Sequence, residues 1–89
     1  MMYPYITLAD ETLITHSQLL DVDGTPTVEV HFERPTEDGF DSARCVLPSY
    51  NWKFNHGYTE AEIEKFEELL RHNAHLIYRY AAEGGLRCA

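Results

Sequence analysis

The last third of the chain has the pattern of one long amphipathic helix, and this feature constrains the fold more than any other. Apolar side chains recur at steps of three and four between Ile63 and Tyr80, so they lie on one face of a helix. A helix with one apolar face needs an apolar surface to cover. We therefore predict a helix from about Glu60 to Glu83 that packs on the part of the chain before it.

Both ends of this predicted helix carry the expected signals. Thr59 and Glu62 have the spacing of a capping box, in which each side chain accepts a hydrogen bond from the backbone N–H of the other residue. Gly84-Gly85 is typical of a left-handed helix stop. Glutamates lie early and arginines late, as the helix dipole favours. The helical segment is therefore 59–85, and the tail 86–89 follows it.

The first half of the chain has the composition of short strands separated by turns. Four segments are predicted as strands: Tyr3–Leu8, Thr12–Leu20, Thr27–Glu33 and Ser42–Leu47. A polar loop over 34–41 joins the last two. If that loop closes symmetrically, it predicts three cross-strand pairs that face the same way: Val28 with Leu47, Val30 with Cys45, and Phe32 with Ala43.

Together these segments predict an α+β fold with the element order ββββα in a single domain, 1–89. A four-stranded antiparallel meander over 1–48 is covered on one face by the helix. The aromatic segment 49–58 is expected to be a connecting loop. Its three large side chains would fill the junction between sheet and helix: Tyr50, Trp52 and Phe54.

A two-residue turn at Asp10-Glu11 sets the predicted register of the first two strands, although the alternation in the second strand is poor. This register places six side chains on the outer face of the sheet: Tyr3, Tyr5, Ile14, His16, His31 and Val46. Such a face is either a protein contact surface or an ordinary solvated face. The two histidines on it could also form an acid–base pair, but no pocket is expected there.

The predicted helix is longer than the predicted strands. Twenty-four helical residues span about 36 Å, whereas strands of six or seven residues span about 20 Å. The end of the helix is therefore expected to overhang the sheet and to form a homodimer. The expected interface contains four residues: Ile77, Tyr78, Tyr80 and Ala81. The alternative is that the tail or the segment around Trp52 covers them within one chain.

The composition restricts the classes of function. Fifteen acidic residues against seven basic ones give a formal net charge of -8, which disfavours direct binding of nucleic acid. No apolar run approaches a membrane span, no signal-peptide pattern follows Met1, and the two cysteines do not form a disulfide framework. We expect a cytoplasmic protein whose acidity either keeps it soluble or engages a basic partner.

One group of side chains could hold a metal ion. Glu68, His72 and His75 are spaced i, i+4 and i+7, which could gather two imidazoles and a carboxylate for zinc in a small metal-binding or hydrolytic domain. The alternative is a pair of exposed helix histidines, because no fourth ligand is evident. No Gly-rich phosphate loop, paired-cysteine motif or nucleophile elbow is present. We therefore expect no cofactor and no enzymatic activity.

Two stretches of the chain resemble small uncharacterised proteins of bacterial phages and integrative elements: His31–Pro48 (HFERPTEDGFDSARCVLP) and Arg71–His75 (RHNAH). In size, acidity and lack of a catalytic motif the chain is also similar to anti-CRISPR and anti-restriction inhibitors. The resemblance implies a protein partner in the cytoplasm of a bacterial host. It assigns no role to any residue.

The leading hypothesis is a non-catalytic interaction protein, in its sharper form an inhibitor whose acidic surface occupies a nucleic-acid groove on a basic protein. The helix acids could instead only complement the helix dipole. The expected partner-binding residues are acidic or aromatic: Tyr3, Tyr5, Asp21, Asp23, Glu37, Asp38, Asp41, Glu60, Glu64, Glu67 and Glu68.

Overall fold

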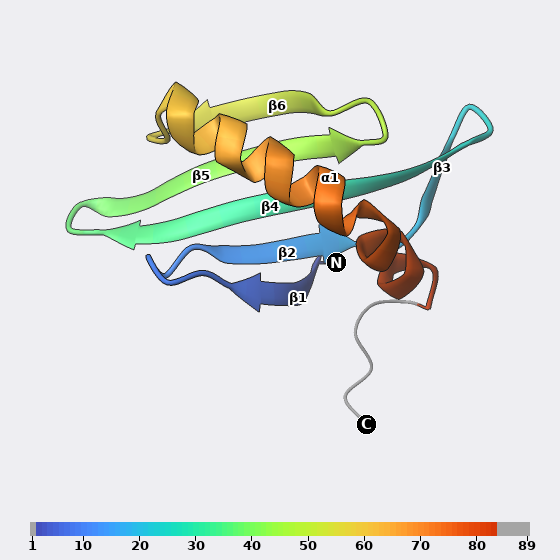
Figure 1. Cartoon of the computed structure of the whole chain (residues 1–89), viewed down its shortest axis with the longest axis horizontal. Coiled ribbons are helices and arrows are strands. Elements are labelled where there is room, and N and C mark those ends of the chain that lie inside the picture. Colours follow the sequence, from blue (N-terminus) through green and yellow to red (C-terminus); the bar gives the residue numbers. More distant parts are fainter. Residues whose placement is uncertain (1, 84–89) are drawn as a thin grey trace.

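Six antiparallel strands and one helix form residues 2–83, the residues that the computed structural model describes (Figure 1). The elements follow in this order: β1 (Met2–Thr7), β2 (Leu13–Ser17), β3 (Leu20–Val22), β4 (Thr25–Thr36), β5 (Gly39–Leu47), β6 (Asn51–His56) and α1 (Glu60–Ala82). The strand order is β1-β2-β4-β5-β6, and β3 pairs with the first residues of β4. The α+β class is confirmed, whereas the predicted number of four strands is wrong. The predicted stop at Gly84-Gly85 and the tail 86–89 lie outside the described residues.

The hairpin of β4 and β5 has the predicted register. The three expected pairs are present: Val28 with Leu47, Val30 with Cys45, and Phe32 with Ala43. Both strands are longer than predicted, because β4 continues to Thr36 and β5 begins at Gly39. The polar loop predicted over 34–41 is therefore only a turn at Glu37-Asp38. As a result, Arg34 and Asp41 face each other as cross-strand partners.

The turn between β1 and β2 differs from the predicted one. The Leu8 N–H donates to the carbonyl oxygen of Thr12 at 2.8 Å, and the Glu11 N–H donates to that of Leu8 at 3.0 Å. Glu11 has a positive φ of 71°. This is the pattern of a three-residue hairpin loop, 9–11, that ends in a left-handed residue. The extra residue shifts the register from that of a two-residue turn.

The shifted register moves two residues from the outer face to the core. Ile6 pairs with Ile14, and a bulge at Tyr5 then pairs Tyr3 with His16. Because a slip of one residue reverses the face of every side chain, Ile14 and His16 are fully buried. The predicted outer placement of Ile14, His16 and the two tyrosines is therefore wrong, and His16 is no neighbour of an outer histidine.

The predicted strand 12–20 is interrupted where the chain bends toward the end of the helix. The Ser17 hydroxyl donates to the carbonyl oxygen of Gln18 at 2.8 Å, and the Leu19 N–H donates to the carbonyl oxygen of Ala81 at 3.1 Å. These two bonds replace strand pairing at the bend. They explain why β2 and β3 are separate strands.

The segment 49–58 contains a strand rather than a connecting loop. Within β6, Trp52 packs on the core side against Phe32, with ring centroids 5.5 Å apart. Phe54 lies on the other face, where the Arg44 guanidinium is 5.9 Å from its ring centre. The aromatic residues of this segment therefore serve both faces of the sheet and do not form a single plug.

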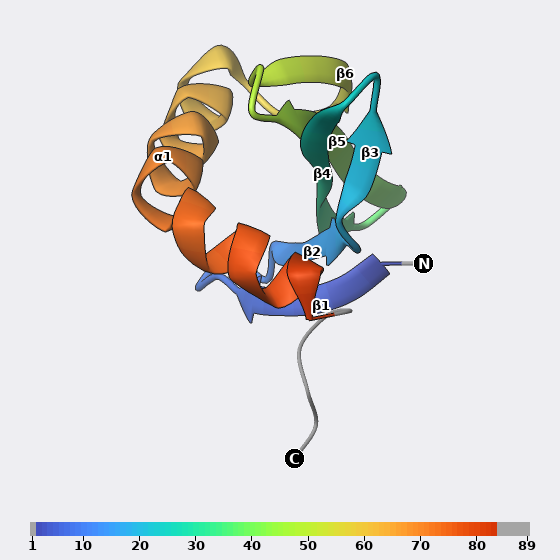
Figure 2. The same ribbon diagram turned by 90° about the vertical axis from the view of Figure 1, so that its right-hand side faces the viewer.

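The helix lies diagonally across the concave face of a curled sheet, from β6 at its start to β2 and β1 at its end (Figures 1 and 2). The Phe32 and Phe66 rings stack across this interface with centroids 4.3 Å apart. Residues of both layers form one core: Ile14, Val28, Val30, Phe32, Ala43, Cys45, Leu47, Tyr58, Phe66, Leu70, Ile77 and Ala81. No helix within residues 2–83 is long and apolar enough to span a membrane.

The expected overhang of the helix is absent, because the sheet reaches its end. Four residues were expected at a dimer interface: Ile77, Tyr78, Tyr80 and Ala81. The first and last of these are only 0% and 2% exposed. The Tyr78 hydroxyl donates to the carbonyl oxygen of Pro26 at 3.0 Å, and the Tyr80 ring centroid lies 6.1 Å from that of Tyr5. The sheet of the same chain thus covers the surface that motivated the dimer.

Candidate functional site

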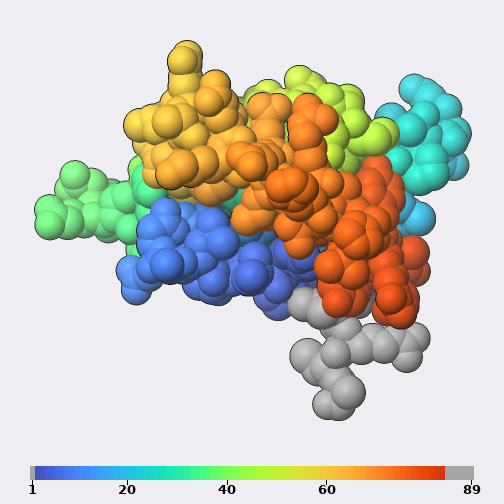
Figure 3. Space-filling model, viewed as in Figure 1, coloured from blue at the N-terminus to red at the C-terminus, as the bar shows by residue number. Residues whose placement is uncertain are grey.

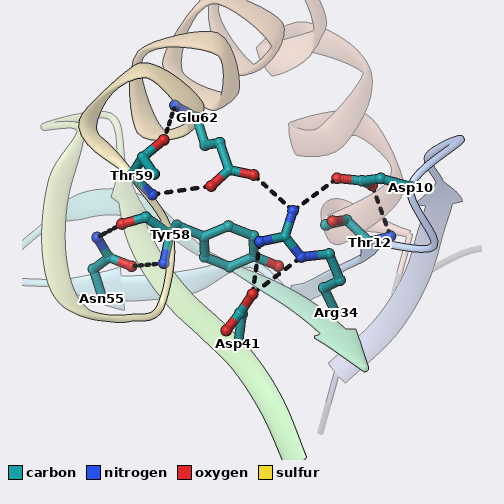
Figure 4. Close-up of polar contacts among 8 residues, drawn as sticks. All are labelled: Asp10, Thr12, Arg34, Asp41, Asn55, Tyr58, Thr59 and Glu62. Carbon is teal, nitrogen blue, oxygen red and sulfur yellow. Dashed lines mark hydrogen bonds and ion pairs between the residues drawn. The ribbon is translucent and has the colours of Figure 1, made fainter. Parts of the chain in front are cut away.

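Arg34 of β4 is the centre of a polar cluster that fixes the start of α1 (Figure 4). Its Nη1 donates to Glu62 at 2.6 Å and to Asp10 at 3.1 Å. Its Nη2 and Nε donate to Asp41 at 2.6 and 3.1 Å. The guanidinium carbon lies 4.7 Å from the centre of the Tyr58 ring. One side chain therefore connects β4, β5, the turn after β1 and the helix.

The electrostatics of this cluster favour the charged forms of Arg34, Asp10 and Glu62. Hydrogen bonds from Arg34 and from the Thr59 backbone lower the pKa of Glu62. Burial raises the pKa of Asp10, but hydrogen bonds from Thr12 and Arg34 outweigh burial, so the net pKa is lowered. The carboxylates, Glu62 first, raise the pKa of Arg34. Groups held in one protonation state at neutral pH suit a structural tie better than proton transfer.

Glu62 also completes the predicted capping box, which is confirmed. Its N–H donates to the Thr59 hydroxyl at 3.2 Å, and its carboxylate accepts from the Thr59 N–H at 3.0 Å. The Asn55 side chain donates to the carbonyl oxygen of Tyr58 at 2.9 Å and accepts from the Tyr58 N–H at 3.1 Å. The link between β6 and α1 is therefore held by hydrogen bonds at each step.

Gly57 makes this link possible. Its φ is 103°, which an L side chain rarely adopts. A Cβ at this position would also overlap the carboxylate of Asp41. The absence of a side chain at Gly57 thus lets the link pass beside Asp41 while that carboxylate binds Arg34.

A groove of about 310 Å³ lies beside this link, between β6 and the first turns of α1. Five residues line it: Trp52, Asn55, Glu60, Ile63 and Glu64. Trp52 and Ile63 are half-buried and supply apolar walls. Glu60 and Glu64 are exposed, and their spacing places them one turn apart on the same side of the helix. The groove therefore combines an aromatic wall with two carboxylates.

The acidic side chains differ in whether they have a basic partner. Six of the fifteen acidic residues lie within ion-pair distance of an arginine, lysine or histidine. The remaining nine have no such partner among residues 2–83: Glu11, Asp21, Asp23, Glu37, Asp38, Glu60, Glu64, Glu67 and Glu68. Four of these nine belong to the first half of α1, which is the largest group on one element.

The structure gathers only part of the predicted partner-binding set. The helix stands as a ridge on the face of the molecule shown in Figure 3. Glu60, Glu64, Glu67 and Glu68 belong to this helix, and their spacing places them on one side of it. The remaining acids of the set are elsewhere. Asp21 and Asp23 belong to the β3–β4 hairpin and Glu37-Asp38 to the β4–β5 turn, at opposite ends of the molecule (Figure 1), and Asp41 belongs to the Arg34 cluster.

The predicted tyrosines lie on the helix side of the sheet. The Tyr5 hydroxyl donates to the Asn73 side chain at 2.8 Å, which shows that Asn73 joins the helix to the sheet. Tyr3 and Tyr5 flank the ring of His16, with centroids 5.8 and 6.5 Å away. The Nδ1 of His16 lies 2.8 Å from the carbonyl oxygen of Ser17 and therefore donates to it. The tyrosines thus contribute to packing rather than to an outer contact surface.

The alternative of a metal site at Glu68, His72 and His75 finds no support among residues 2–83. Glu68, His72 and His75 are exposed on the solvent side of the helix. Within residues 2–83, no three histidine, cysteine, aspartate or glutamate side chains converge in a way that could hold a metal ion. The i, i+4, i+7 spacing aligns these residues along the helix, but none of the strands described in 2–83 brings a ligand to them.

The outer face carries one histidine with close neighbours. The Nε2 of His31 lies 3.8 Å from Glu33, and its ring centroid is 6.0 Å from that of Phe54. Burial, followed by the charge of Arg44, lowers the pKa of His31, which favours the neutral imidazole. This histidine does not line the groove at Trp52.

The sequence pattern does not predict two features of this region. Arg34 belongs to the predicted loop 34–41. If each of the two predicted strands continues by one residue, Arg34 lies opposite Asp41. The groove at Trp52 was missed because its segment was not recognised as a strand. Its signal is the alternation of Trp52 with polar neighbours from Asn51 to Asn55.

Comparisons with models of protein families, with curated proteins and with solved structures find no match.

Proposed function

We propose that this chain is a non-catalytic protein-interaction module that binds a basic protein through the first half of α1. The observation that carries this proposal is the acidic ridge of Glu60, Glu64, Glu67 and Glu68. None of the four has a basic partner within residues 2–83. Glu62 lies on the same turns of the helix but, unlike these four, forms an ion pair with Arg34.

Neither complementation of the helix dipole nor solubility accounts for this ridge. The dipole acts within the first turn, where Glu60 and Glu62 already lie. Glu64, Glu67 and Glu68 belong to later turns. Solubility requires net charge but no particular placement. Along the helix axis, Glu60, Glu64 and Glu67 follow at steps of about 6 and 4.5 Å, and Glu68 lies next to Glu67. Acids spaced in this way form an extended surface that complements a basic groove.

The sharper form of the proposal is an inhibitor that occupies the nucleic-acid groove of a nucleic-acid-binding protein in a bacterial cytoplasm, as anti-CRISPR and anti-restriction proteins of phages and mobile elements do. Two observations support it. Four of the nine acids without a basic partner lie on a single helix, and the Arg34 cluster and the capping box fix that helix on the sheet. A preformed charged surface loses little conformational entropy on binding.

The experiment compares two charge reversals of equal size. Glu64→Lys with Glu68→Lys changes the ridge, and Glu37→Lys with Asp38→Lys makes the same change of net charge at the β4–β5 turn. Proteins captured from a bacterial lysate by the wild type are identified, and their affinity is measured against salt concentration. The proposal expects a nucleic-acid-binding partner, steep salt dependence and loss of binding only with the ridge variant.

Two results would contradict the proposal. Equal weakening by both variants would show that net charge alone acts. Binding that is insensitive to salt and unchanged by the ridge variant would show that the acidic ridge is not the contact surface.

A further inference from the structure

We propose that the groove between β6 and α1 receives one arginine side chain of the protein partner. This inference rests on the proposed function and names the chemistry of the contact. The groove volume of about 310 Å³ lies at the lower end of the range for ligand sites, which is roughly 300–1,000 Å³. It therefore suits a single side chain better than an extended small molecule.

The walls of the groove match the aliphatic stem and the charged guanidinium of an arginine. Trp52 and Ile63 are half-buried apolar surfaces, on which the aliphatic stem can pack. Tryptophan is the best aromatic partner for a cation. Glu60 and Glu64 lie within the same lining and can accept hydrogen bonds from a planar guanidinium.

No cation of the described chain fills this place. Glu60 and Glu64 have no ion pair within residues 2–83. The nearest basic residue along β6, Lys53, is bound to Glu29 at 2.9 Å. Arg71, further along the helix, lies 4.3 Å from the centre of the Tyr50 ring. The groove thus presents negative charge that an external group can neutralise.

The chain itself provides an example of the proposed contact. Arg34 lies 4.7 Å from the centre of the Tyr58 ring while Glu62 and Asp41 bind its guanidinium. The groove combines the same kinds of group, one aromatic ring with two carboxylates where Arg34 has three, but it holds no guanidinium. The charge complementarity that holds the start of the helix on the sheet is repeated, without its cation, at this groove on the other flank of the helix.

The groove is also preformed. Trp52 packs on Phe32, and the Asn55 side chain is fixed by two hydrogen bonds to the backbone of Tyr58. The other wall belongs to the capped start of α1. Binding an arginine therefore requires no rearrangement of the walls, which lowers the entropy cost.

Trp52 is the only tryptophan of the chain, so its fluorescence reports on this groove. The probe is a capped peptide with a single arginine, compared with the same peptide carrying neutral citrulline or carrying lysine. We expect saturable fluorescence change with the arginine peptide at roughly millimolar concentration, several-fold weaker binding of the lysine peptide, and none with citrulline. Equal binding of the citrulline peptide, or no response to arginine, would overturn the inference.

Two matched variants separate the groove from general charge. Glu60→Gln with Glu64→Gln is expected to weaken binding of the arginine peptide about tenfold, which corresponds to about 1.4 kcal/mol. Glu67→Gln with Glu68→Gln removes the same charge from the same helix outside the groove and is expected to change binding less than twofold. Equal weakening of arginine-peptide binding by both variants would overturn the inference that the arginine binds in the groove.

The same variants distinguish this inference from the proposed function. If partner binding depends on the acidic ridge while the peptide gives no Trp52 response, the groove inference fails and the proposed function stands. If partner binding is insensitive to all four glutamates, the proposed function fails, whatever the peptide does.

Discussion

Both halves of α1 bury apolar side chains against the sheet, but only the first adds a charged anchor. In this charged half, Phe66 stacks on Phe32, three carboxylates share Arg34, and the capping box fixes the first turn. The second half is held by buried apolar side chains such as Ile77 and by neutral hydrogen bonds from Tyr5 and Tyr78. The two halves also differ in the side chains that they leave exposed. Three of these in the first half are glutamates, whereas the charged ones in the second half are arginines. The half available to a basic partner is therefore the first.

The largest expected effect lies in the apolar half. Ile77→Ala removes a fully buried side chain and is expected to lower the free energy of unfolding by about 2–5 kcal/mol. His75→Ala, two residues earlier and exposed, serves as the control and is expected to stay within about 0.5 kcal/mol. Urea unfolding measures both. Similar effects of the two variants would show that the second half does not pack on the sheet.

The next effect lies in the charged half. Arg34→Ala leaves Asp10, Asp41 and Glu62 without their shared cation. Because these groups are partly exposed, we expect a loss of about 1–3 kcal/mol, less than for a fully buried pair. Arg79→Ala is the control, because the Arg79 side chain is 72% exposed and its ion pair with Glu83 is long, at 3.8 Å. A loss no larger than that of Arg79→Ala would show that the cluster does not anchor the helix.

The N-cap makes a smaller contribution to the same anchor. Thr59→Ala removes the acceptor for the Glu62 N–H and is expected to cost about 1 kcal/mol. Thr59→Ser keeps the hydroxyl and should recover most of that stability. Thermal unfolding followed by circular dichroism measures both variants, and equal melting temperatures for alanine and serine would argue against a stabilising cap.

The smallest effect is expected from pH. Folding holds the pKa of Asp10 and Glu62 below their ordinary values of 3.8 and 4.5. For a lowered pKa, the stabilisation is complete above the ordinary value and is lost as the pH falls through the folded-state value. Stability should therefore decline below about pH 4.5, and the decline should be shallower in Arg34→Ala. Identical pH dependence of urea unfolding in the two proteins would contradict this assignment.

Local signals explain what the sequence predicted well. The capping box at Thr59 and Glu62 and the apolar repeat of the helix depend on residues a few positions apart, so they are readable without knowing the fold. The β4–β5 pairs were also predicted correctly, because a short turn joins two strands with matching alternation. In both cases, local preference and tertiary packing favour the same structure.

The remaining differences have non-local causes. The bulge at Tyr5 is stabilised by the hydrogen bond to Asn73, which lies 68 positions later in the sequence. The bend at Leu19 depends on the carbonyl oxygen of Ala81. The strand β6 was hidden because its polar residues resemble those of a loop, and only pairing with β5 reveals it. One wall of the groove belongs to β6, so the groove could not be predicted without that strand.

The bond from the Leu19 N–H to Ala81 affects how mutational data on this protein must be interpreted. The Leu19 side chain is 40% exposed, and its backbone makes the contact whatever the side chain is. An alanine scan would therefore classify position 19 as tolerant and would overlook a tie between the sheet and the last turn of the helix. Among the natural amino acids, only proline removes the donor, so a scan for such backbone ties must use proline or an ester in place of the amide.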